Sequence, residues 1–481
     1  MVFEQFYLAC LSHASYLIGD GGEAAVVDPQ RDVDLYLDAA RERGLTIRYV
    51  IESHLHADFV SGHRELAERA GAEIVLGHRA EATFPHRAVK EGDVIRLGSL
   101  RLVFLETPGH TPESMAIVVY DDSAGAMPLK VLTGDTLFVG DVGRPDLVTS
   151  KGYTAEDMAG MLYDSVHTKL LTLPDSVEVY PSHGAGSACG RNIGRERFST
   201  IGEQRRVNPS LRAMSRAEFI RRTTTDLPPA PAYFGFDAET NRRGAPALAD
   251  LPAPPGLAPG EVRRRAAEGA IVLDVRDGAR WANGHVPGSL NVGLGGQFAS
   301  WAGSLVPVGA PIVLVTDELG EVEEARMRLA RVGLENVVGY LEGGIAEWDR
   351  AGEAVGTTEL LSVDELRAQL ATTGDALRVL DVRRPDEFEM GHVPGATNEP
   401  LDRFAPRALE TARAASASAS ASPSPSPGAG PLAVVCQTGY RSSTAVSLLA
   451  PHHRGPIYNV VGGTTAWVDS GAPLERVETP A

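Results

Sequence analysis

The chain has 481 residues, of which 43% are hydrophobic and 22% charged, and its net charge is −18. At roughly 100–200 residues per domain, this length predicts about three domains. The acidic balance argues against nucleic acid and anionic membranes as partners, because both bind basic surfaces. Residues 1–22 lack a basic segment, and no apolar run reaches the roughly 18 residues that span a membrane, so we expect a cytoplasmic protein.

The first 110 residues alternate between predicted strands and helices. Two strands are expected in residues 1–30, FYLACLSHASYLIG and AAVVDP, on either side of the Gly21–Gly22 turn. Cys10 lies in the first of these strands and is expected in the core. Further along the chain we expect helices at 32–44 and 62–70, a strand at 47–53, the strand EIVLG and a hairpin at 93–110.

The next 150 residues continue the alternation and then change composition. Strands are expected at MAIVVYDD, 129–135 and 176–184, and helices at 154–171 and SRAEFIRR. An Ala/Pro-rich run at 246–255 is typical of a semi-stiff linker, so we place the end of the first domain at residue 245.

Four predicted strands run directly into a metal-capable side chain. These residues are His54, His110, Asp135 and His183, and the first opens the motif HLHAD with His56 and Asp58. Strand ends along one sheet edge are where α/β proteins place ligands. The sequence therefore predicts a metal site built from strand ends.

The motifs HLHAD at 54–58, PGH at 108–110, TGD at 133–135 and PSH at 181–183 resemble those of the metallo-β-lactamase fold. The resemblance covers residues 1–245. It implies an αββα sandwich, in which two sheets pack face to face with helices outside and a metal lies among the loops.

Phe59 follows Asp58 where dinuclear members of that fold carry a further histidine. A second ion would then depend on Asp58, Asp135 and His183, so we expect one metal per chain. His54, His110 and Asp135 form the two-histidine, one-carboxylate set that suits Fe(II) and oxygen chemistry, with zinc as the alternative. His56, Asp58 and His183 are then supporting groups or alternative ligands.

The stretch GDVGRPDL at 140–147 resembles a motif of persulfide dioxygenases, the iron-containing branch of the fold. That resemblance implies oxidation of a low-molecular-weight thiol persulfide with O2 to sulfite and free thiol. Arg144 is then a candidate for binding a substrate carboxylate, with a structural ion pair to Asp146 or Asp141 as the alternative. Cys189 is weighed as a buried thiol or as a thiol near the metal.

Beyond the linker the chain repeats itself. IVLDVRDGARWANGHVPG and RVLDVRRPDEFEMGHVPG are followed in each repeat by a GG-x-x-x-W motif. These motifs resemble rhodanese domains, which implies two parallel α/β domains at 256–356 and 357–478. Residues 412–430 inside the second repeat are rich in Ala, Ser and Pro and are expected to be a disordered insertion.

Cys436 begins the loop CQTGYR of the second repeat, which ends at Arg441. The resemblance implies that Cys436 carries sulfur as a persulfide and that Arg441 belongs to its loop. In the first repeat, counting back from the GG motif puts Asp317 opposite Cys436, so that repeat is expected to be inactive.

The favoured hypothesis is an iron-dependent persulfide dioxygenase coupled to sulfane-sulfur transfer through Cys436, with sulfite converted to thiosulfate. One alternative is a zinc-dependent thioester hydrolase like glyoxalase II. Another is a sulfur-relay scaffold in which only Cys436 is active. We expect the chain to form a homo-oligomer.

Overall fold

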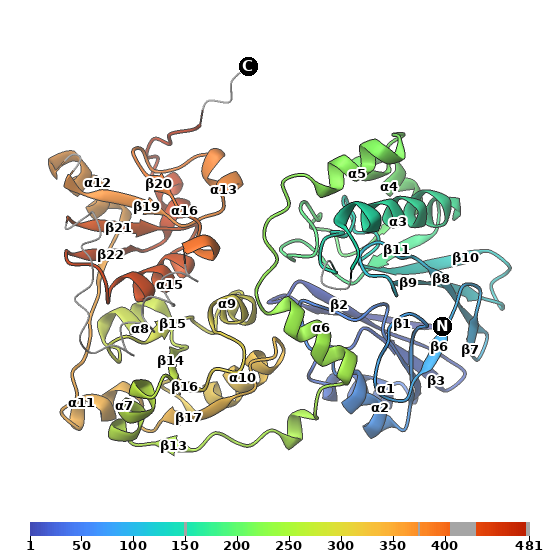
Figure 1. Ribbon diagram of the computed structural model, residues 1–481, viewed down its shortest axis with the longest axis horizontal. Helices are drawn as coiled ribbons and strands as arrows, with labels where there is room; N and C mark the ends of the chain where they lie inside the picture. The colour runs from blue at the N-terminus through green and yellow to red at the C-terminus, as the bar shows by residue number, and fades with distance from the viewer. Residues whose placement is uncertain (149–151, 374–375, 405–429, 478–481) are drawn as a thin grey trace. The chain divides into compact units, whose positions relative to one another are not determined.

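The computed structural model describes residues 1–148, 152–373, 376–404 and 430–477. The chain divides into two compact units: Met1–Pro252 together with Ala330–Gly333, and the rest of the chain from Ala253 onward (Figure 1). The predicted domain boundaries at 245, 255 and 356 stay predictions. Of the predicted insertion 412–430, only Gly430 lies within the described residues.

The first sheet of the N-terminal unit contains six strands among the described residues, in the order β1 to β6. They are β1 (Val2–Leu8), β2 (His13–Asp20), β3 (Glu23–Val27), β4 (Thr46–Ile51), β5 (Glu73–Gly77) and β6 (Arg87–Val89). The pairing is antiparallel from β1 to β3 and parallel from β3 to β6. Parallel neighbours need crossover connections, and α1 (Asp34–Glu42) and α2 (His63–Ala70) supply those from β3 to β4 and from β4 to β5.

The second sheet of this unit also has six strands in the described part, in the order β12-β11-β10-β9-β8-β7. They are β7 (Val94–Leu97), β8 (Leu100–Glu106), β9 (Met115–Asp121), β10 (Pro128–Gly134), β11 (Glu178–Pro181) and β12 (Ser199–Thr200). The helices are α3 (Ala155–Thr168), α4 (Ile201–Val207), α5 (Arg216–Thr224) and α6 (Phe234–Arg243), with 3₁₀ turns η2 (Leu170–Thr172), η3 (Pro209–Leu211) and η4 (Leu248–Asp250).

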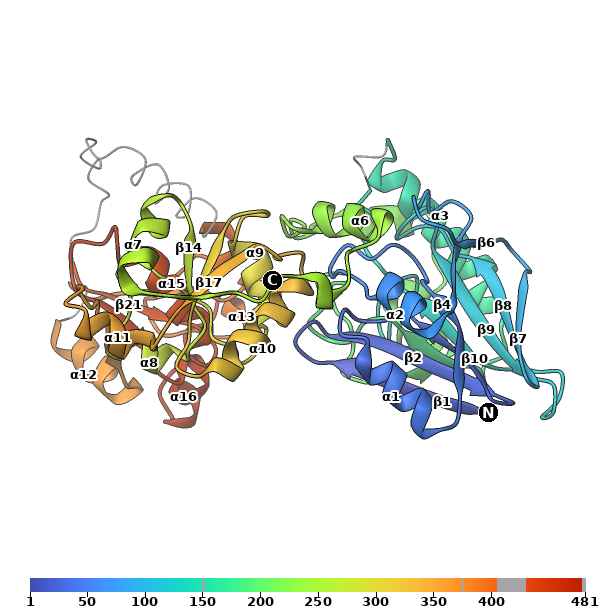
Figure 2. The same cartoon turned by 90° about the horizontal axis from the view of Figure 1, so that it is seen from below.

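The core of the N-terminal unit lies between its two sheets. Alternate residues of facing strands meet there, among them Tyr16 and Ile18 from β2 and Leu102 and Phe104 from β8. The outer face of the first sheet packs against α1 and α2, and that of the second against α3. Figure 2 shows the two sheets facing each other, which confirms the predicted αββα sandwich.

The C-terminal unit holds two sheets of the same strand order, each with five strands among the described residues. The first is β13 (Gly256–Leu257), β17 (Val337–Leu341), β16 (Ile312–Val315), β14 (Ile271–Asp274) and β15 (Leu290–Asn291). The second is β18 (Glu359–Leu361), β22 (Ile457–Val460), β21 (Leu432–Val435), β19 (Arg378–Asp381) and β20 (Thr397–Asn398). Every pairing within them is parallel, which confirms the predicted pair of parallel α/β domains.

Helices cover these sheets, because parallel sheets are buried on both faces. Those of the first repeat are α7 (Pro259–Ala267), α8 (Gly278–Asn283), α9 (Phe298–Leu305), α10 (Leu319–Ala330) and α11 (Gly344–Arg350). Those of the second are α12 (Val363–Thr373), α13 (Pro385–Glu389), α15 (Tyr440–Leu449) and α16 (Gly463–Asp469). Among the described residues, no helix has the length and apolar character needed to cross a membrane.

One predicted element is wrong. The sequence predicts a single strand over residues 6–19, but the structure has β1 and β2 joined by a tight turn at 9–12. Ser12 adopts a left-handed conformation (φ 52°), and its N–H donates to the carbonyl of Ala9. Cys10 therefore lies half-buried in a turn and not in the core of a strand.

Candidate functional site

The four predicted strand-end residues lie at the ends of strands from both sheets of the N-terminal unit. His54 follows β4, His110 follows β8, Asp135 follows β10 and His183 follows β11. All four side chains are at most 1% exposed. Two sheets thus deliver imidazole and carboxylate groups into the interior at one edge of the sandwich.

His54, His110 and Asp135 form the first cluster, with donor atoms that all lie within 4.8 Å of one another. Asp135 Oδ2 is 3.9 Å from His54 Nε2 and 3.5 Å from His110 Nε2. Neither His54 Nε2 nor Asp135 Oδ2 has a hydrogen-bond partner. Buried polar atoms are nearly always satisfied, so these converging orphans fit a metal ion.

The other ring nitrogens of the two histidines are held by neighbours. His110 Nδ1 lies 2.9 Å from the carbonyl oxygen of Arg144, to which it donates. Ser53 Oγ donates to Asp28 and therefore accepts from His54 Nδ1, 3.0 Å away. With Nδ1 protonated on both rings, both Nε2 lone pairs face the cluster, as a metal ligand requires.

The charge state of the first cluster also suits a cation. Burial lowers the pKa of His54 well below its usual value, so its ring is neutral. Burial by itself would raise the pKa of Asp135, but the charge and hydrogen bond of His183, together with His54 and His110, hold it well below the usual range. The cluster therefore offers a neutral imidazole from His54 and an anion from Asp135.

His183 lies between two carboxylates. Its Nδ1 is 2.8 Å from Asp135 Oδ1, and its Nε2 is 2.8 Å from Asp58 Oδ2. Asp58, His183 and Cys189 form a second group whose donor atoms lie within 4.8 Å of one another. Burial raises the pKa of the Cys189 thiol well above its usual value, and Asp58 and Asp135 raise it further.

His56 belongs to a third buried group, with Asp28 and Glu52. Its Nε2 is 3.3 Å from Asp28 Oδ1 and 3.5 Å from Glu52 Oε2. Burial by itself would lower the pKa of His56, but the two carboxylates raise it to about 9. The sequence reasoning missed Asp28 and Glu52, although both lie at the ends of predicted strands.

Phe59 is 1% exposed and packs beside His13 and His56, with its ring centroid 4.1 Å from that of His13 and 4.4 Å from that of His56. Its apolar ring therefore occupies space next to Asp58 without offering a donor atom. His13, which the sequence reasoning did not single out, lies next to His183 through an isolated β-bridge.

Arg144 is 3% exposed and forms a bidentate ion pair with Asp146, at 2.7 and 2.8 Å. The same guanidinium donates to the carbonyl oxygens of Pro228 and Ala188. These contacts match the ion pair that the sequence left open for Arg144. A substrate-binding role would have to compete with them and stays a prediction.

In the C-terminal unit, Cys436 follows β21 and is 1% exposed. The backbone N–H of Gly439 donates to its Sγ at 3.1 Å, and Ser442 Oγ does so at 3.5 Å. Gly439 has φ 100°, a left-handed conformation that turns the loop into α15. Donors converging at a helix N-terminus stabilise a thiolate or a persulfide anion.

The first repeat differs from the alignment expected from its sequence. Val315 pairs with Asp274 as Val435 pairs with Asp381, so Thr316 and not Asp317 lies opposite Cys436. The count from the GG motif is off by one because α10 has 12 residues and α15 has 10, which more than offsets the shorter loop before α10. Thr316 has no thiol, so the expectation that this repeat carries no sulfur is unaffected.

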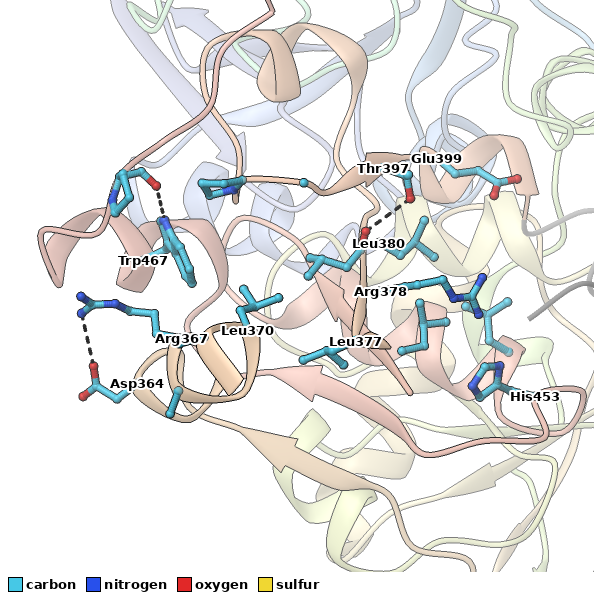
Figure 3. A pocket seen from close by; sticks show the side chains of 18 residues that line it. Asp364, Arg367, Leu370, Leu377, Arg378, Leu380, Thr397, Glu399, His453 and Trp467 are labelled. Carbon is cyan, nitrogen blue, oxygen red and sulfur yellow. Dashed lines mark hydrogen bonds and ion pairs between the residues drawn. The ribbon is translucent and has the colours of Figure 1, made fainter. Parts of the chain in front are cut away.

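A cavity of about 1170 Å³ lies in the second repeat beside β19 and α12. Figure 3 shows its side chains, which mix basic groups such as Arg367 and His453 with apolar groups such as Leu370 and Trp467. Neither Cys436 nor any residue of its loop lines this cavity. It is therefore separate from the sulfur-transfer site.

An αββα sandwich with a buried His–His–Asp cluster at one edge defines the metallo-β-lactamase class of proteins. Residues 8–183 match the Metallo-beta-lactamase superfamily, and residues 258–351 and 362–470 each match the Rhodanese-like domain. The chain belongs to the metallo-β-lactamase superfamily and carries two rhodanese-like domains.

Two curated relatives resemble the N-terminal half. The human protein named Persulfide dioxygenase ETHE1, mitochondrial, is 31% identical over 237 residues, which are 48% of this chain and 83% of that protein. A Hydroxyacylglutathione hydrolase of Rhodopseudomonas palustris (strain BisB18) is 31% identical over 246 residues, 50% of this chain and 86% of that one.

A solved structure resembles a larger part of the chain. The metallo-beta-lactamase from Staphylococcus aureus subsp. aureus COL is 32% identical and covers 70% of this chain and 98% of its own, with a TM-score of 0.63. The likeness thus extends beyond the N-terminal domain.

Proposed function

We propose that the chain is an iron-dependent persulfide dioxygenase linked to a sulfurtransferase. In the first reaction a thiol persulfide anion, O2 and water give sulfite, the free thiol and a proton. In the second, sulfite takes the outer sulfur of a persulfide on Cys436, which gives thiosulfate and returns the thiolate. The observation that carries the proposal is the buried convergence of His54, His110 and Asp135.

His54, His110 and Asp135 fit a single Fe(II), because two imidazoles and one carboxylate on one side leave other positions free. Bound iron supplies the redox chemistry that O2 needs. The chain's own groups do the rest: Ser53 and the Arg144 carbonyl orient the imidazoles, and His183 fixes the Asp135 carboxylate through Oδ1. Burial of the whole cluster excludes bulk water from the reacting sulfur.

The Cys436 loop supports the second reaction. Gly439 and Ser442 direct hydrogen-bond donors at Sγ, where the persulfide charge would lie. A covalent link between the two catalytic domains raises the effective concentration of sulfite at Cys436 compared with free diffusion. The similarity to the human relative, which is named a persulfide dioxygenase, supports the same substrate class.

The test is O2 uptake by the full chain, loaded with Fe(II) and supplied with a thiol persulfide. We expect O2 consumption with sulfite, and with thiosulfate when persulfide is in excess. His54→Ala should abolish both O2 uptake and sulfite. Cys436→Ser should keep O2 uptake and sulfite but lose thiosulfate. If iron-loaded wild type consumes no O2, the proposal is wrong.

A second candidate function is hydrolysis of a glutathione thioester with zinc. The likeness to the hydroxyacylglutathione hydrolase of R. palustris favours it, whereas Phe59 and the rhodanese-like domains give it no support. Zinc-loaded protein that hydrolyses the thioester, together with iron-loaded protein that ignores persulfides, would favour this candidate.

A further inference from the structure

The helix that follows the Cys436 loop is held by residues of the first repeat. Tyr440, the first residue of α15, donates its hydroxyl to the carbonyl oxygen of Gly293 at 2.7 Å. One turn later, Ser443 donates its hydroxyl to Oδ1 of Asn291 at 2.6 Å. Both acceptors belong to the repeat that lacks a cysteine at its strand end. We propose that Asn291 and Gly293 are positioning groups for sulfur transfer at Cys436, an inference that rests on the proposed function.

Asn291 links α15 to the sheet of the first repeat. It is the last residue of β15, which lies beside α15 (Figure 1), and its side chain is 1% exposed. Its Nδ2 donates to the carbonyl oxygens of Asp274 and Arg276, at 3.1 and 2.9 Å. Its backbone N–H donates to Ser447 Oγ at 3.0 Å. The amide group therefore cannot turn without breaking buried hydrogen bonds, which makes it a firm anchor for α15.

The second repeat shows what the contact with α15 adds to the ordinary role of this asparagine. Asn398 occupies the equivalent place at the end of β20, and its Nδ2 donates to the carbonyl oxygens of Asp381 and Arg383. The same pattern in both repeats holds a strand end against the DVR motif. In the first repeat the amide oxygen also accepts from α15 of the other repeat. That additional bond belongs to the interface between the repeats.

A glycine allows the close approach of the two repeats at this point. The DVR motifs align Gly278 at the start of α8 with Pro385 of the second repeat. A Cβ atom on Gly278 would lie 2.6 Å from Ser443 Oγ and 2.8 Å from Ser443 Cβ, closer than side-chain atoms approach one another. The absence of a side chain at this position therefore leaves room for the helix that follows the Cys436 loop.

The anchor of α15 matters because of Gly439. The backbone N–H of Gly439 donates to Sγ of Cys436 at 3.1 Å, and its φ of 100° is left-handed. Glycine has more conformational freedom than any other residue, so a donor on glycine is held only as firmly as its neighbours. The loop starts at the end of β21, and Tyr440, which follows Gly439, is held by Gly293. The first repeat thus preorganises a hydrogen-bond donor that is aimed at sulfur.

The test isolates the second reaction in the full chain by using a His54→Ala background, in which the proposed oxidation is absent. A thiol persulfide and sulfite are supplied. The Cys436 thiolate takes the outer sulfur of the thiol persulfide and releases the thiol. Sulfite then forms a bond to that sulfur, the sulfur–sulfur bond to Cys436 breaks, and its electron pair stays on the thiolate. The kcat and the KM for sulfite are measured from the thiosulfate formed.

Tyr440→Phe and Ser443→Ala each remove one hydroxyl from a hydrogen bond between the repeats. Each should lower kcat about fivefold and leave the KM for sulfite unchanged, because the donors are loosened while access to the persulfide is not altered. Exchange of the Gly439 amide hydrogen with solvent should become faster, whereas the β21 amides should keep their wild-type rates. Tyr458→Phe and Ser470→Ala, the same atom changes elsewhere in the second repeat, should alter none of these values.

Two results would overturn the inference. One is a wild-type kcat together with wild-type exchange of the Gly439 amide in Tyr440→Phe and Ser443→Ala. The other is faster exchange that spreads over β21, which would show that the two hydroxyls stabilise the whole repeat. A background protein that forms no thiosulfate contradicts the second reaction of the proposed function instead. In that case the exchange of the Gly439 amide still decides whether the first repeat positions the loop.

Discussion

Arg441 and Glu387 form a bidentate ion pair in which both nitrogen–oxygen distances are 2.7 Å. The pair ties the first turn of α15, directly after the Cys436 loop, to α13, an element from another part of the same repeat. Both side chains are largely shielded from solvent, at 16% and 18% exposure, so the pair is stronger than a surface ion pair.

Glu387→Gln should slow sulfur transfer from Cys436 to sulfite by about tenfold, because a loop with an unanchored arginine no longer holds its backbone donors against Sγ. The measurement is thiosulfate formed per Cys436 persulfide. Glu389→Gln, an exposed neighbour on the same helix, is the matched control. Unchanged transfer in a folded Glu387→Gln variant would show that the pair has no role in the loop.

Asp135→Asn should lower iron affinity and O2 uptake by at least about 100-fold, because it removes the only anion of the first cluster and weakens the bond to His183. Asp175→Asn, a surface change that affects only the pair with Arg205, should leave both at the wild-type level. Iron content and O2 uptake are measured on the same samples. Full iron content in Asp135→Asn would contradict the ligand assignment.

The buried side chain of His63 makes the stability of the N-terminal domain depend on pH. Burial, together with the charges of His56 and nearby arginines, lowers the pKa of His63 to about 3 from 6.5. Between about pH 3 and pH 6.5, the unfolded chain therefore binds a proton at His63 that the folded chain does not bind. Above about pH 6.5, His63 does not lower the free energy of unfolding. Below that pH, the free energy of unfolding falls by up to about 1.4 kcal/mol per pH unit.

His63→Gln should flatten this dependence by one proton. All four tryptophans lie beyond residue 280, so their fluorescence does not report on this domain. Hydrogen exchange of the β2 to β4 amides between pH 7 and about pH 5 gives the slope directly. An unchanged slope in His63→Gln would mean that other groups take up the proton.

Arg144→Ala should lower the free energy of unfolding of the N-terminal domain by about 3 kcal/mol, because it leaves a carboxylate without its partner in a largely buried pair. Asp146→Asn should have a similar effect, and the double variant should lose little more than either one. A role in binding substrate predicts instead that Arg144→Ala raises KM and that Asp146→Asn does not. Denaturation and persulfide kinetics on the three variants separate the two roles.

Thr316→Cys in a Cys436→Ser background should not restore sulfur transfer. The new thiol would lie at the equivalent strand end, but the loop before α10 is one residue shorter and contains the acidic Glu318. Donors would therefore not converge on it as they do on Cys436. Thiosulfate formation by the double variant would show that loop length is not the limiting property.

The sequence predicts the αββα sandwich, the two parallel domains and the His54–His110–Asp135 cluster because each depends on local signals. Strand ends beside histidines mark the cluster, and repeated motifs mark the two domains. The turn at 9–12 contains neither Gly nor Pro, so the sequence does not predict it. An ungapped count does not place Thr316 opposite Cys436, because the segment from β16 to the GG motif is one residue longer than the matching segment of the second repeat.

Other features depend on the path of the chain in space. Nothing in HGAGSACG fixes where its thiol points, so the approach of Cys189 to Asp58 could not be derived from spacing. Likewise, the proximity of Asp28 to Glu52 depends on the parallel pairing of β3 with β4, which the sequence does not show. Such contacts join residues that are far apart along the chain, and periodicity carries no information about them.

Arg144 has a consequence for how this protein could diversify. The backbone of Arg144 supports both donor groups, because its carbonyl oxygen accepts from His110 and its N–H donates to the carbonyl of Cys189. The guanidinium anchors this backbone through its ion pair with Asp146. A mutation selected to suit a different thiol carrier at this residue would therefore disturb both donor groups at once. Adaptation of substrate preference should then proceed through other residues around the centre, while residue 144 changes slowly.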